Sequence, residues 1–464
     1  ITIGDWSSDV CSSDLLKKRL QVMESSSSAW RSLDPPSQVV SCMTCLYKRQ
    51  LTTTSGGNVS VKDGNGSIWV TPTGIDKCNI CNDQICCILP DRSIRGSYKP
   101  TSEWLMHFEA YEQRDSIGAI VHTHSPSILA FAISRKLPTV DTFVHVHRFL
   151  GGIASVPYCI CGGKELADEC AKAVAENPTC CCFVLQNHGA LVVGENVEEA
   201  FARLELLEKI ARLSLEIMQS SSPPLSTPYN DTIDMSLPCD ATECVDIDTF
   251  AKRAYAQKLI VCEHFFSKRL SDANRFCYSP LLTLPPFASP TLFKSMVLTD
   301  ASSSDLLRWH ASLYTEYPAI RCIFQCLPLH ASILLAQQRP IDADLMPESC
   351  VVLKEVAFIP FSSHSLQDLL AKAKEGCSVF LVERVGVIIT ATTLMQAFDR
   401  LEVLEATCEA IHLCDRLSIP IQQLNPQQIE EIKQHFGGVL IPKSSSSLCW
   451  NHVQTVTSSR SIPL

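Results

Sequence analysis

Residues 119–126 read Ala-Ile-Val-His-Thr-His-Ser-Pro, and the predicted fold is organised around this stretch. Its apolar start predicts a buried strand, which ends in His122 and His124. Side chains alternate across a strand, so both imidazoles lie on the same face and can reach one ion. His188 follows a second predicted strand over 182–185, in a turn before a glycine. Three neutral imidazoles with an open fourth position are typical of a catalytic zinc site.

Two other interpretations of the histidines stay open from the residues alone. Strand-end histidines can hydrogen-bond to their neighbours without binding an ion. A second pair, His145 and His147, has the same spacing and is the weaker candidate for a ligand pair.

Predicted strands and helices alternate on both sides of the quoted stretch. In chain order they are a helix over 39–49, a hairpin of strands 59–61 and 67–70, helices over 103–113 and 127–134, strands over 182–185 and 190–193, and a long helix from near 196 to 218. The apolar side chains of the long helix recur at steps of three and four, which indicates one buried face.

Glu103 stands at the start of a predicted helix, directly after the hydroxyls of Thr101 and Ser102. Its carboxylate can stabilise the helix N-terminus, which is the default role at such a position. It can also act as a general acid or base beside the metal. Free amides and small hydroxyls form an anion site. Further donors that can cradle a phosphate occupy two turns: Asn58, Thr73 and Gly74.

The second half of the chain repeats the first. The pattern Ala-Phe-x-Arg-Leu-Glu-x-Leu-Glu occurs at 200–208 and again at 397–405. Upstream, two more residues recur at one constant offset: His107 and Tyr111 match His310 and Tyr314. Matched segments in the same order indicate a tandem duplication of one domain.

The second copy lacks the residues that carry chemistry in the first. At the offset that relates His107 to His310, Gln325 and Leu327 match His122 and His124, and Leu306 matches Glu103. At the offset of the repeated helix pattern, Val385 matches His188. No comparable set of three histidines can be assembled there. Residues 244–440 are therefore predicted to form a metal-free, degenerate domain.

Length, charge and cysteine content narrow the class of protein. At 464 residues the chain is too long for one ordinary core, which predicts two domains. A net charge of −10 without a basic stripe argues against a nucleic-acid surface, and no apolar run is long enough to cross a bilayer. Several of the 24 cysteines lie in strand-like runs, where buried thiols act as small hydrophobes, and a reducing cytoplasm is expected. Two CxxC pairs, at 42/45 and 78/81, lack the context of a zinc ribbon.

Changes in composition set the expected domain boundaries. Residues 1–35 are expected to be an artefactual or disordered N-terminal segment, followed by a catalytic domain over 36–218. The stretch 219–243 is rich in Ser, Pro and Thr and is expected to be a linker. The degenerate domain over 244–440 and a flexible tail over 441–464 complete the chain.

Five short motifs stand in one order along the first half of the chain. They are Gly57-Asn58-Val59-Ser60, Thr71-Pro72-Thr73-Gly74, Thr101-Ser102-Glu103-Trp104, His122-Thr123-His124-Ser125-Pro126 and Asn187-His188-Gly189. Over residues 36–218 this set resembles the class II aldolase/adducin family, and most closely its fuculose-phosphate aldolases. The resemblance implies an α/β fold: a three-layer α/β/α sandwich around a central, mostly antiparallel sheet, here in two tandem copies.

The resemblance also implies a role for each motif. Zn²⁺ would be held by His122, His124 and His188, Glu103 would be the acid/base, and the substrate phosphate would be held by Asn58, Thr73, Gly74, Thr101 and Ser102. Zinc would polarise a ketose phosphate such as dihydroxyacetone phosphate while Glu103 removes a proton, and the resulting enediolate would add to an aldehyde. A glutamate at position 103 favours aldol chemistry over epimerisation, because epimerase-like members carry aspartate there.

The family leaves two other functions open for this chain. One is a zinc-dependent sugar-phosphate dehydratase that resembles methylthioribulose-phosphate dehydratase, and the other is a non-catalytic, adducin-like interaction module. Family aldolases place tyrosines from a neighbouring subunit over the site, whereas the nearest position here holds Phe143. Family members form four-fold rings, so a homo-oligomer is expected, either two chains that build a pseudo-tetramer or a higher assembly. The expected ligand is a small phosphorylated sugar, with no nucleic acid or membrane as partner.

Overall fold

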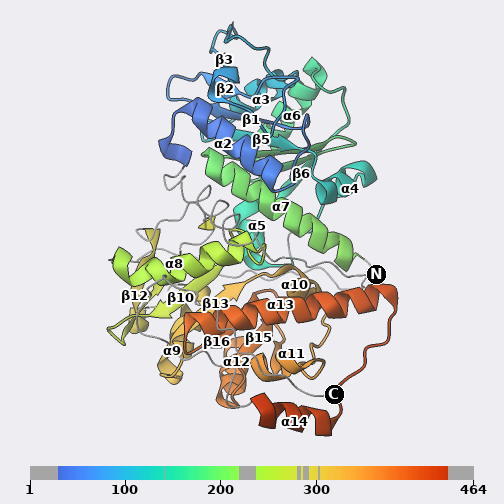
Figure 1. Ribbon diagram of the computed structural model, residues 1–464. Coiled ribbons are helices and arrows are strands. Elements are labelled where there is room, and N and C mark those ends of the chain that lie inside the picture. Colours follow the sequence, from blue (N-terminus) through green and yellow to red (C-terminus); the bar gives the residue numbers. More distant parts are fainter. Residues whose placement is uncertain are drawn as a thin grey trace, which may run out of the picture.

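The computed structural model describes residues 30–139, 142–218, 237–279, 284–285, 292–300 and 304–436. These residues form two eight-stranded, mostly antiparallel sheets, one in each half of the chain (Figure 1). Separate apolar cores on the two faces of each sheet show that helices cover both faces. The predicted fold, a three-layer α/β/α sandwich in two tandem copies, is confirmed.

The first sheet has the strand order β4-β3-β2-β1-β5-β8-β7-β6. Its strands are β1 (Asn58–Lys62), β2 (Ile68–Val70), β3 (Cys86–Ile88), β4 (Ile94–Arg95), β5 (Ala119–Thr123), β6 (Ile153–Val156), β7 (Cys182–Leu185) and β8 (Gly189–Gly194). Neighbouring strands are antiparallel except β6 and β7. The strand that carries the histidine pair, β5, is central and fully buried between β1 and β8.

Helices cover the two faces of this sheet. One face carries α2 (Pro35–Lys48), α4 (Pro126–Ser134), α5 (Val144–Leu150) and α7 (Val197–Ile217), the other carries α3 (Trp104–Tyr111) and α6 (Lys164–Glu176), and η1 (Trp30–Ser32) and η2 (Asn82–Gln84) are short turns. Local sequence sets the helix starts, because the side chains of Asp34 and Asn196 accept hydrogen bonds from backbone amides at the starts of α2 and α7.

The second sheet has the order β14-β15-β16-β13-β10-β11-β12-β9. Its strands are β9 (Leu237–Pro238), β10 (Phe265–Arg269), β11 (Arg275–Tyr278), β12 (Lys294–Val297), β13 (Cys322–Cys326), β14 (Val356–Ile359), β15 (Val379–Val382) and β16 (Gly386–Ala391). Read from β9, this order matches that of the first sheet at every position except the edge strand: β4 follows β3 in the chain, whereas β9 precedes β10. The parallel pair β14 and β15 takes the place of β6 and β7.

The helices of the second half form matching layers. One face carries α8 (Ala241–Ala256), α10 (Leu329–Ala336), α11 (Pro347–Val352) and α13 (Leu394–Leu417). The other face carries α9 (Asp305–Glu316) and α12 (Ser365–Lys374). The short helix η5 (Leu298–Asp300) follows β12, and α14 (Pro426–Phe436) packs on α11. Although α7 and α13 are long, no helix in the described part of the chain is apolar enough over a sufficient length to cross a membrane.

One apolar core continues from the first half into the second. In Figure 1, α7 lies along the boundary, and it packs against α10 of the second half. Tyr255 of α8 donates a hydrogen bond to the Glu205 carboxylate of α7 at 2.6 Å, and Arg49 pairs with the same carboxylate at 2.5 Å. The two halves are therefore joined by apolar packing around a buried ion pair.

Two predicted boundaries differ from the described structure. Trp30 is buried, and its ring packs edge-on against Phe201 with 5.4 Å between centroids, so the first core begins before residue 36. The expected linker over 219–243 ends inside ordered structure, because β9 pairs with β12 and α8 starts at Ala241. Strand pairing outweighs the loop-like composition there. The other parts of these predicted segments lie outside the described residues: 1–29, 219–236 and 437–464.

Candidate metal and acid–base site

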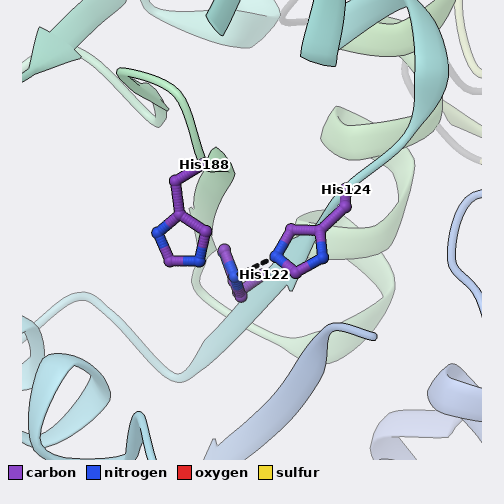
Figure 2. Close-up of side chains that lie close together, drawn as sticks. All are labelled: His122, His124 and His188. Carbon is purple, nitrogen blue, oxygen red and sulfur yellow. Dashed lines mark hydrogen bonds between the residues drawn. The ribbon is translucent and has the colours of Figure 1, made fainter. Parts of the chain in front are cut away.

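The histidine pair lies at the end of β5. Register places Asn58 of β1 opposite His122, and β8 pairs with the other edge of the strand. The two imidazoles point to the same side (Figure 2), with 4.8 Å between ring centroids and 3.0 Å between their Nε2 atoms. His122 is fully buried, whereas His124 is partly exposed. Strand alternation thus gives one buried and one accessible imidazole at the same point.

His188 reaches this point from the turn between β7 and β8. Asn187 adopts a φ of 56° in that turn. Gly189 packs so closely on β5 that an added Cβ would lie 2.4 Å from the Thr123 carbonyl oxygen, which only glycine permits. The His188 ring centroid lies 4.7 and 5.2 Å from those of the other two histidines. Three imidazoles from two strand ends therefore face one another (Figure 2).

Glu103 directs its carboxylate at the histidines rather than at its helix. It is the N-cap residue of α3 but makes no side-chain capping bond. Its Oε2 lies 3.4 Å from His122 Nε2, and its Oε1 lies 3.1 Å from His188 Nε2. Asn58 donates a hydrogen bond from Nδ2 to Oε2 at 2.7 Å. The capping role, the default interpretation from local sequence, is not the one that this side chain takes.

A chain of buried hydrogen bonds fixes Asn58 and, through it, Glu103. The hydroxyl of Ser60 lies 2.9 Å from Tyr111 Oη and 2.7 Å from His107 Nδ1. His107 Nε2 contacts Asn58 Oδ1, a carbonyl oxygen that can only accept. Burial lowers the pKa of His107 to about 4, so its neutral ring carries the proton on Nε2. Ser60 therefore donates to His107 Nδ1, and the amide hydrogens of Asn58 face Glu103.

Burial and the facing carboxylate set the charges in the site. Burial lowers the pKa of His122 to about 3, against the attraction of Glu103, and burial also lowers the pKa of His124. Burial acts to raise the pKa of Glu103, but the close approach of His188, the attraction of His122 and the Asn58 amide hold that pKa well below its usual range. At neutral pH the site thus contains an ionised carboxylate beside two neutral imidazoles, the forms that bind a cation.

The donor set fits a divalent metal ion. His122 donates from Nδ1 to the Ala190 carbonyl at 2.9 Å, which directs the lone pair of its Nε2 into the site. Buried His188 Nδ1 and Glu103 Oε1 have no hydrogen-bond partner. One nitrogen from each of the three histidines lies within 4.8 Å of the others. Converging imidazole lone pairs are stabilised by a cation between them, so His122, His124 and His188 form a three-nitrogen site that suits Zn²⁺.

The residues predicted to bind phosphate lie on two adjoining segments. A bridge between Pro72 and Pro100 brings the turn over 71–74 beside residues 100–102. Of the predicted set, Thr73, Gly74 and Ser102 are exposed, whereas Thr101 and Asn58 are buried. Asn58 directs Nδ2 at the Thr101 hydroxyl and the Glu103 carboxylate, so it positions the carboxylate rather than presenting a free donor.

Two residues near the site were missed by sequence reasoning. Cys161 lies in the loop between β6 and α6, with Sγ 3.5 Å from His188 Nε2. Lys77 is buried beside the predicted phosphate turn, where Nζ donates to the Pro72 carbonyl at 3.1 Å. Burial lowers the pKa of Lys77 to about 8. The motif Cys161-Gly162-Gly163 indicates a loop in the sequence. No local pattern, however, connects Cys161 or Lys77 with the histidines.

The weaker candidates from the sequence have other surroundings. His145 and His147 lie in helix α5, so the strand alternation that would bring two imidazoles to one ion is absent. Phe143, at the start of that helix, is only 1% exposed and packs in the apolar core. Among the described residues, neither CxxC pair belongs to a group of three close metal-ligand side chains.

The matching position in the second sheet has a different donor set. Asn58 and His122 oppose each other in β1 and β5, and the same register in β10 and β13 pairs Phe265 with Gln325. The Phe265 ring packs edge-on against His310, with 4.8 Å between centroids. An aromatic side chain therefore takes the place of the amide that holds Glu103 in the first half.

Apolar side chains close the rest of that position. An added Cβ at Gly386 would lie 2.6 Å from Leu327 Cδ2, just as one at Gly189 would lie 2.7 Å from His124 Cδ2. The residues that stand in place of the predicted metal ligands and the predicted acid/base are all buried: Leu306, Gln325, Leu327 and Val385. The described residues of the second half hold no counterpart of the three-histidine set.

One protein family matches both halves of the chain, and individual known proteins match a smaller part of it. The family described as Class II Aldolase and Adducin N-terminal domain matches residues 37–215 and 293–412. An L-fuculose phosphate aldolase from Methanococcus maripaludis is 39% identical over 171 residues, which cover 36% of this chain and 89% of the relative. A 3-oxo-tetronate 4-phosphate decarboxylase from Escherichia coli is 30% identical over 172 residues, 36% of this chain and 80% of the relative. A solved L-fuculose 1-phosphate aldolase structure is 30% identical, with a TM-score of 0.38 and coverage of 42% of this chain and 92% of that one.

Proposed function

The chain belongs to the class II aldolase and adducin family, and we propose that it is a zinc-dependent aldolase that cleaves or forms a carbon–carbon bond in a phosphorylated sugar. L-Fuculose 1-phosphate is the proposed substrate, because a relative with 39% identity is named for that chemistry. The observation that carries the proposal is the position of the Glu103 carboxylate, 3.1 and 3.4 Å from two of the three converging imidazoles.

Glu103 is the proposed acid/base. A divalent ion held by His122, His124 and His188 would supply a Lewis acid for the carbonyl of a ketose phosphate. In the direction of synthesis, Glu103 takes the proton from the carbon next to that carbonyl, and in cleavage it returns the proton. Asn58 holds the Oε2 atom of Glu103, which leaves Oε1 without a hydrogen-bond partner and available to the substrate.

The turn over 71–74 and residues 100–102 are the proposed site for the substrate phosphate. Gly74 has a φ of 72°, and no atom lies within 4 Å of the place that a Cβ would take, so backbone amides of the turn can approach an anion closely. The hydroxyls of Thr73 and Ser102 are exposed beside it. The buried ammonium of Lys77 lies against the Pro72 carbonyl and adds positive charge to the turn. This combination of donors and charge suits a phosphate.

Metal analysis and activity of the full chain test the proposal together. Wild type, His122→Ala and Gln325→Ala are purified side by side, and their zinc content and cleavage of L-fuculose 1-phosphate are measured. His122→Ala is expected to lose about one equivalent of zinc and the activity, because an open catalytic site depends on all three protein ligands. Gln325→Ala changes the matching position of the second half and is expected to keep both.

Three outcomes would contradict parts of the proposal. Unchanged zinc content in His122→Ala would contradict ligation by the histidines. Cleavage by protein stripped of divalent ions would contradict metal dependence. Zinc binding without cleavage of L-fuculose 1-phosphate or related ketose 1-phosphates would contradict aldol chemistry, and dehydration or decarboxylation of sugar-acid phosphates would then be assayed, since a relative with 30% identity is named as a decarboxylase.

We further propose that the chain works as a homo-oligomer in a reducing compartment, the cytoplasm. Every cysteine among the described residues is a free thiol, which supports a reducing environment. The mass of the native particle by light scattering is expected to be that of two chains or more. A fully active monomer would contradict the proposed assembly.

A further inference from the structure

A second group of metal-ligand side chains lies in the other half of the chain, away from the histidines. Cys239, Cys244 and Cys277 are buried, and their sulfur atoms lie within 4.8 Å of one another. Within the described ranges it is the one such group whose three ligands are all sulfur. This thiol cluster shares no residue with the site proposed above.

Three separate elements bring the sulfurs together. Cys239 follows β9, and its amide donates to the Phe293 carbonyl at 3.1 Å beside β12. Cys244 lies near the start of α8, and Cys277 lies on β11 between β10 and β12. All three side chains belong to the apolar layer that also holds the α8 residue Ile247. Because sheet pairing and a helix fix the three backbones, the fold holds the thiol cluster ready without a flexible loop.

The thiol cluster is not a remnant of the histidine site. Cys277 opposes Lys268 in the pair of β10 and β11, and the matching pair of β1 and β2 places Trp69 opposite Val61. In the first half an indole, with its Nε1 bonded to Asp63 at 2.9 Å, thus stands where the second half has a thiol. The two halves therefore also differ at the position of Trp69 and Cys277, where only the second half has a side chain that can bind a metal ion.

A positively charged side chain lies close to the thiol cluster. Arg275 precedes Cys277 by two residues on β11, so its side chain leaves the strand on the same face. Its guanidinium donates to Ser295 Oγ at 2.5 Å, and Ser295 opposes Cys277 in the pair of β11 and β12. A guanidinium at this place lowers the cost of negative charge on a buried sulfur.

We propose that Cys239, Cys244 and Cys277 bind Cu⁺. Thiolates select soft ions, and a set of three sulfurs suits the low coordination number of Cu⁺. Structural Zn²⁺ sites have four ligands, and the described residues offer no fourth side chain in this group. Binding replaces the thiol protons, which leave to solvent, and transfers no electron.

Anaerobic titration of the full chain with Cu⁺ tests the proposal. The starting protein carries His122→Ala and Cys78→Ala, which disable the histidine site and the exposed pair of Cys78 and Cys81. It is expected to take about one equivalent of Cu⁺ from a colorimetric chelator, with thiolate-to-copper absorption in the ultraviolet. Cys244→Ala in this protein is expected to lose that equivalent, whereas Cys408→Ala, which removes a buried thiol of α13, keeps it.

Thermal unfolding separates loss of the ion from loss of the fold. Added Cu⁺ is expected to raise the Tm of the starting protein and not that of Cys244→Ala. If Cys244→Ala does not fold, Cys239→Ala replaces it, because Cys239 is 8% exposed while the other two thiols are fully buried. Three results would overturn the proposal. They are equal Cu⁺ binding with and without the cysteine change, no Cu⁺ binding by the folded starting protein, and retention of Zn²⁺ in preference to Cu⁺. The His122→Ala change makes each of these results independent of the aldolase assignment.

Discussion

The two halves of the chain share one frame but differ at the end of the central strand. In the first half, Glu208 of α7 accepts the amides of Ser127 and Ile128 at the start of α4, at 2.9 and 3.0 Å. In the second half, Glu405 of α13 accepts two amides at the start of α10 in the same way, at 2.9 and 3.1 Å. The contacts that build the sandwich persist in both halves, while the proposed metal ligands and the proposed acid/base stand in the first half only.

The buried hydrogen bonds behind the site show how the second half changed without losing its fold. Ser267 Oγ lies 2.7 Å from His310 Nδ1 and 2.8 Å from Tyr314 Oη, which repeats the arrangement of the first half. His310 Nε2 then lies 3.2 Å from Gln325 Oε1, at the strand position that His122 holds in the first sheet. Gln325, which stands at the position of a proposed metal ligand, thus gives the buried His310 ring its hydrogen-bond partner. Buried polar groups must stay paired, whereas groups that serve only catalysis can be replaced.

The largest expected difference between the halves concerns the acid/base. Glu103→Gln keeps the size of the side chain but removes the proton acceptor, so kcat is expected to fall by about 10²–10⁴-fold. Zinc content is expected to stay unchanged, because all three histidines remain. Leu306→Met at the matching position of the second half is the control and is expected to change neither quantity. Steady-state kinetics with metal analysis measure both, and wild-type kcat in Glu103→Gln would contradict the acid/base role.

The shared hydrogen-bond chain sharpens the comparison, because the same change has different consequences in the two halves. Ser60→Ala and Ser267→Ala each remove the hydroxyl that pairs with a buried ring nitrogen and a tyrosine hydroxyl. Each change is expected to lower the free energy of unfolding by about 1–3 kcal/mol. Only Ser60 lies behind Asn58 and Glu103, so only Ser60→Ala is expected to lower kcat as well, by roughly 10- to 100-fold. Urea unfolding and kinetics on both variants measure the two effects.

A purely structural role for the hydrogen-bond chain would give a different pattern. Ser60→Ala would then lose stability with unchanged kcat, as Ser267→Ala is expected to do. A positioning role is also expected to alter the pH profile of kcat in Ser60→Ala, because the hydrogen bond from Asn58 helps to hold the pKa of Glu103 low.

The fold and the three histidines were predictable because their signals are local. Alternation within one strand puts His122 and His124 on one face, whatever else the chain does. The glycine after His188 marks a tight turn with a close backbone approach, and the structure shows both at Gly189. The repeated helix pattern likewise survives in each half, because the buried face of a long helix is set by spacing alone.

The direction of the Glu103 side chain followed from the family resemblance but not from local sequence, because it depends on contacts between distant segments. Local sequence favours a capping role, but Asn58, from a strand 45 residues earlier, holds the carboxylate beside the histidines. Cys161 comes near the site because Gly162, with a φ of 74°, packs its loop so closely on the Ser102 backbone that a Cβ would lie 2.9 Å from the carbonyl oxygen. The thiol cluster has the same origin, since its sulfurs come from three separate elements.

Acidification is expected to weaken both halves through their matching buried histidines. Burial lowers the pKa of His310 to about 3 and that of His107 to about 4, from about 6.5 in the unfolded chain. The folded state keeps these rings neutral while the unfolded state takes up protons below pH 6.5. This part of the stability is therefore present above pH 6.5 and is lost as the pH falls toward the folded pKa, by up to about 1.4 kcal/mol per pH unit and ring.

Urea unfolding of metal-free protein between pH 5 and 7.5 measures that loss. His310→Gln is expected to make the fall with acid shallower, because one ring that titrates only in the unfolded state is gone. The exposed His364 offers a matched control, and His364→Gln is expected to leave the slope unchanged. The same steep slope in His310→Gln as in wild type would contradict a role for this ring in acid sensitivity.

The smallest expected effect concerns Cys161, which lies in the loop between β6 and α6. That loop covers residues 157–163, whereas its counterpart between β14 and α12 covers 360–364, so the second half has a shorter segment at this place. Cys161 Sγ lies 3.5 Å from His188 Nε2 but is not needed to complete the three-nitrogen site, so Cys161→Ala is expected to keep zinc and to change kcat/KM by less than about tenfold.

Iodoacetamide turns this small effect into a clear test. Burial raises the pKa of the Cys161 thiol, so alkylation is expected to be slow at pH 7 and faster at higher pH. An added acetamide group beside His188 would occupy the space in front of the site, so activity is expected to fall in step with modification of Cys161 measured by mass spectrometry. Cys161→Ala is expected to resist inactivation, while Cys78→Ala, which removes another exposed thiol far from the histidines in sequence, is expected to stay sensitive. Equal inactivation of both variants would assign the effect to another cysteine. It would also mean that the longer loop of the first half does not lie close enough to the site to affect activity.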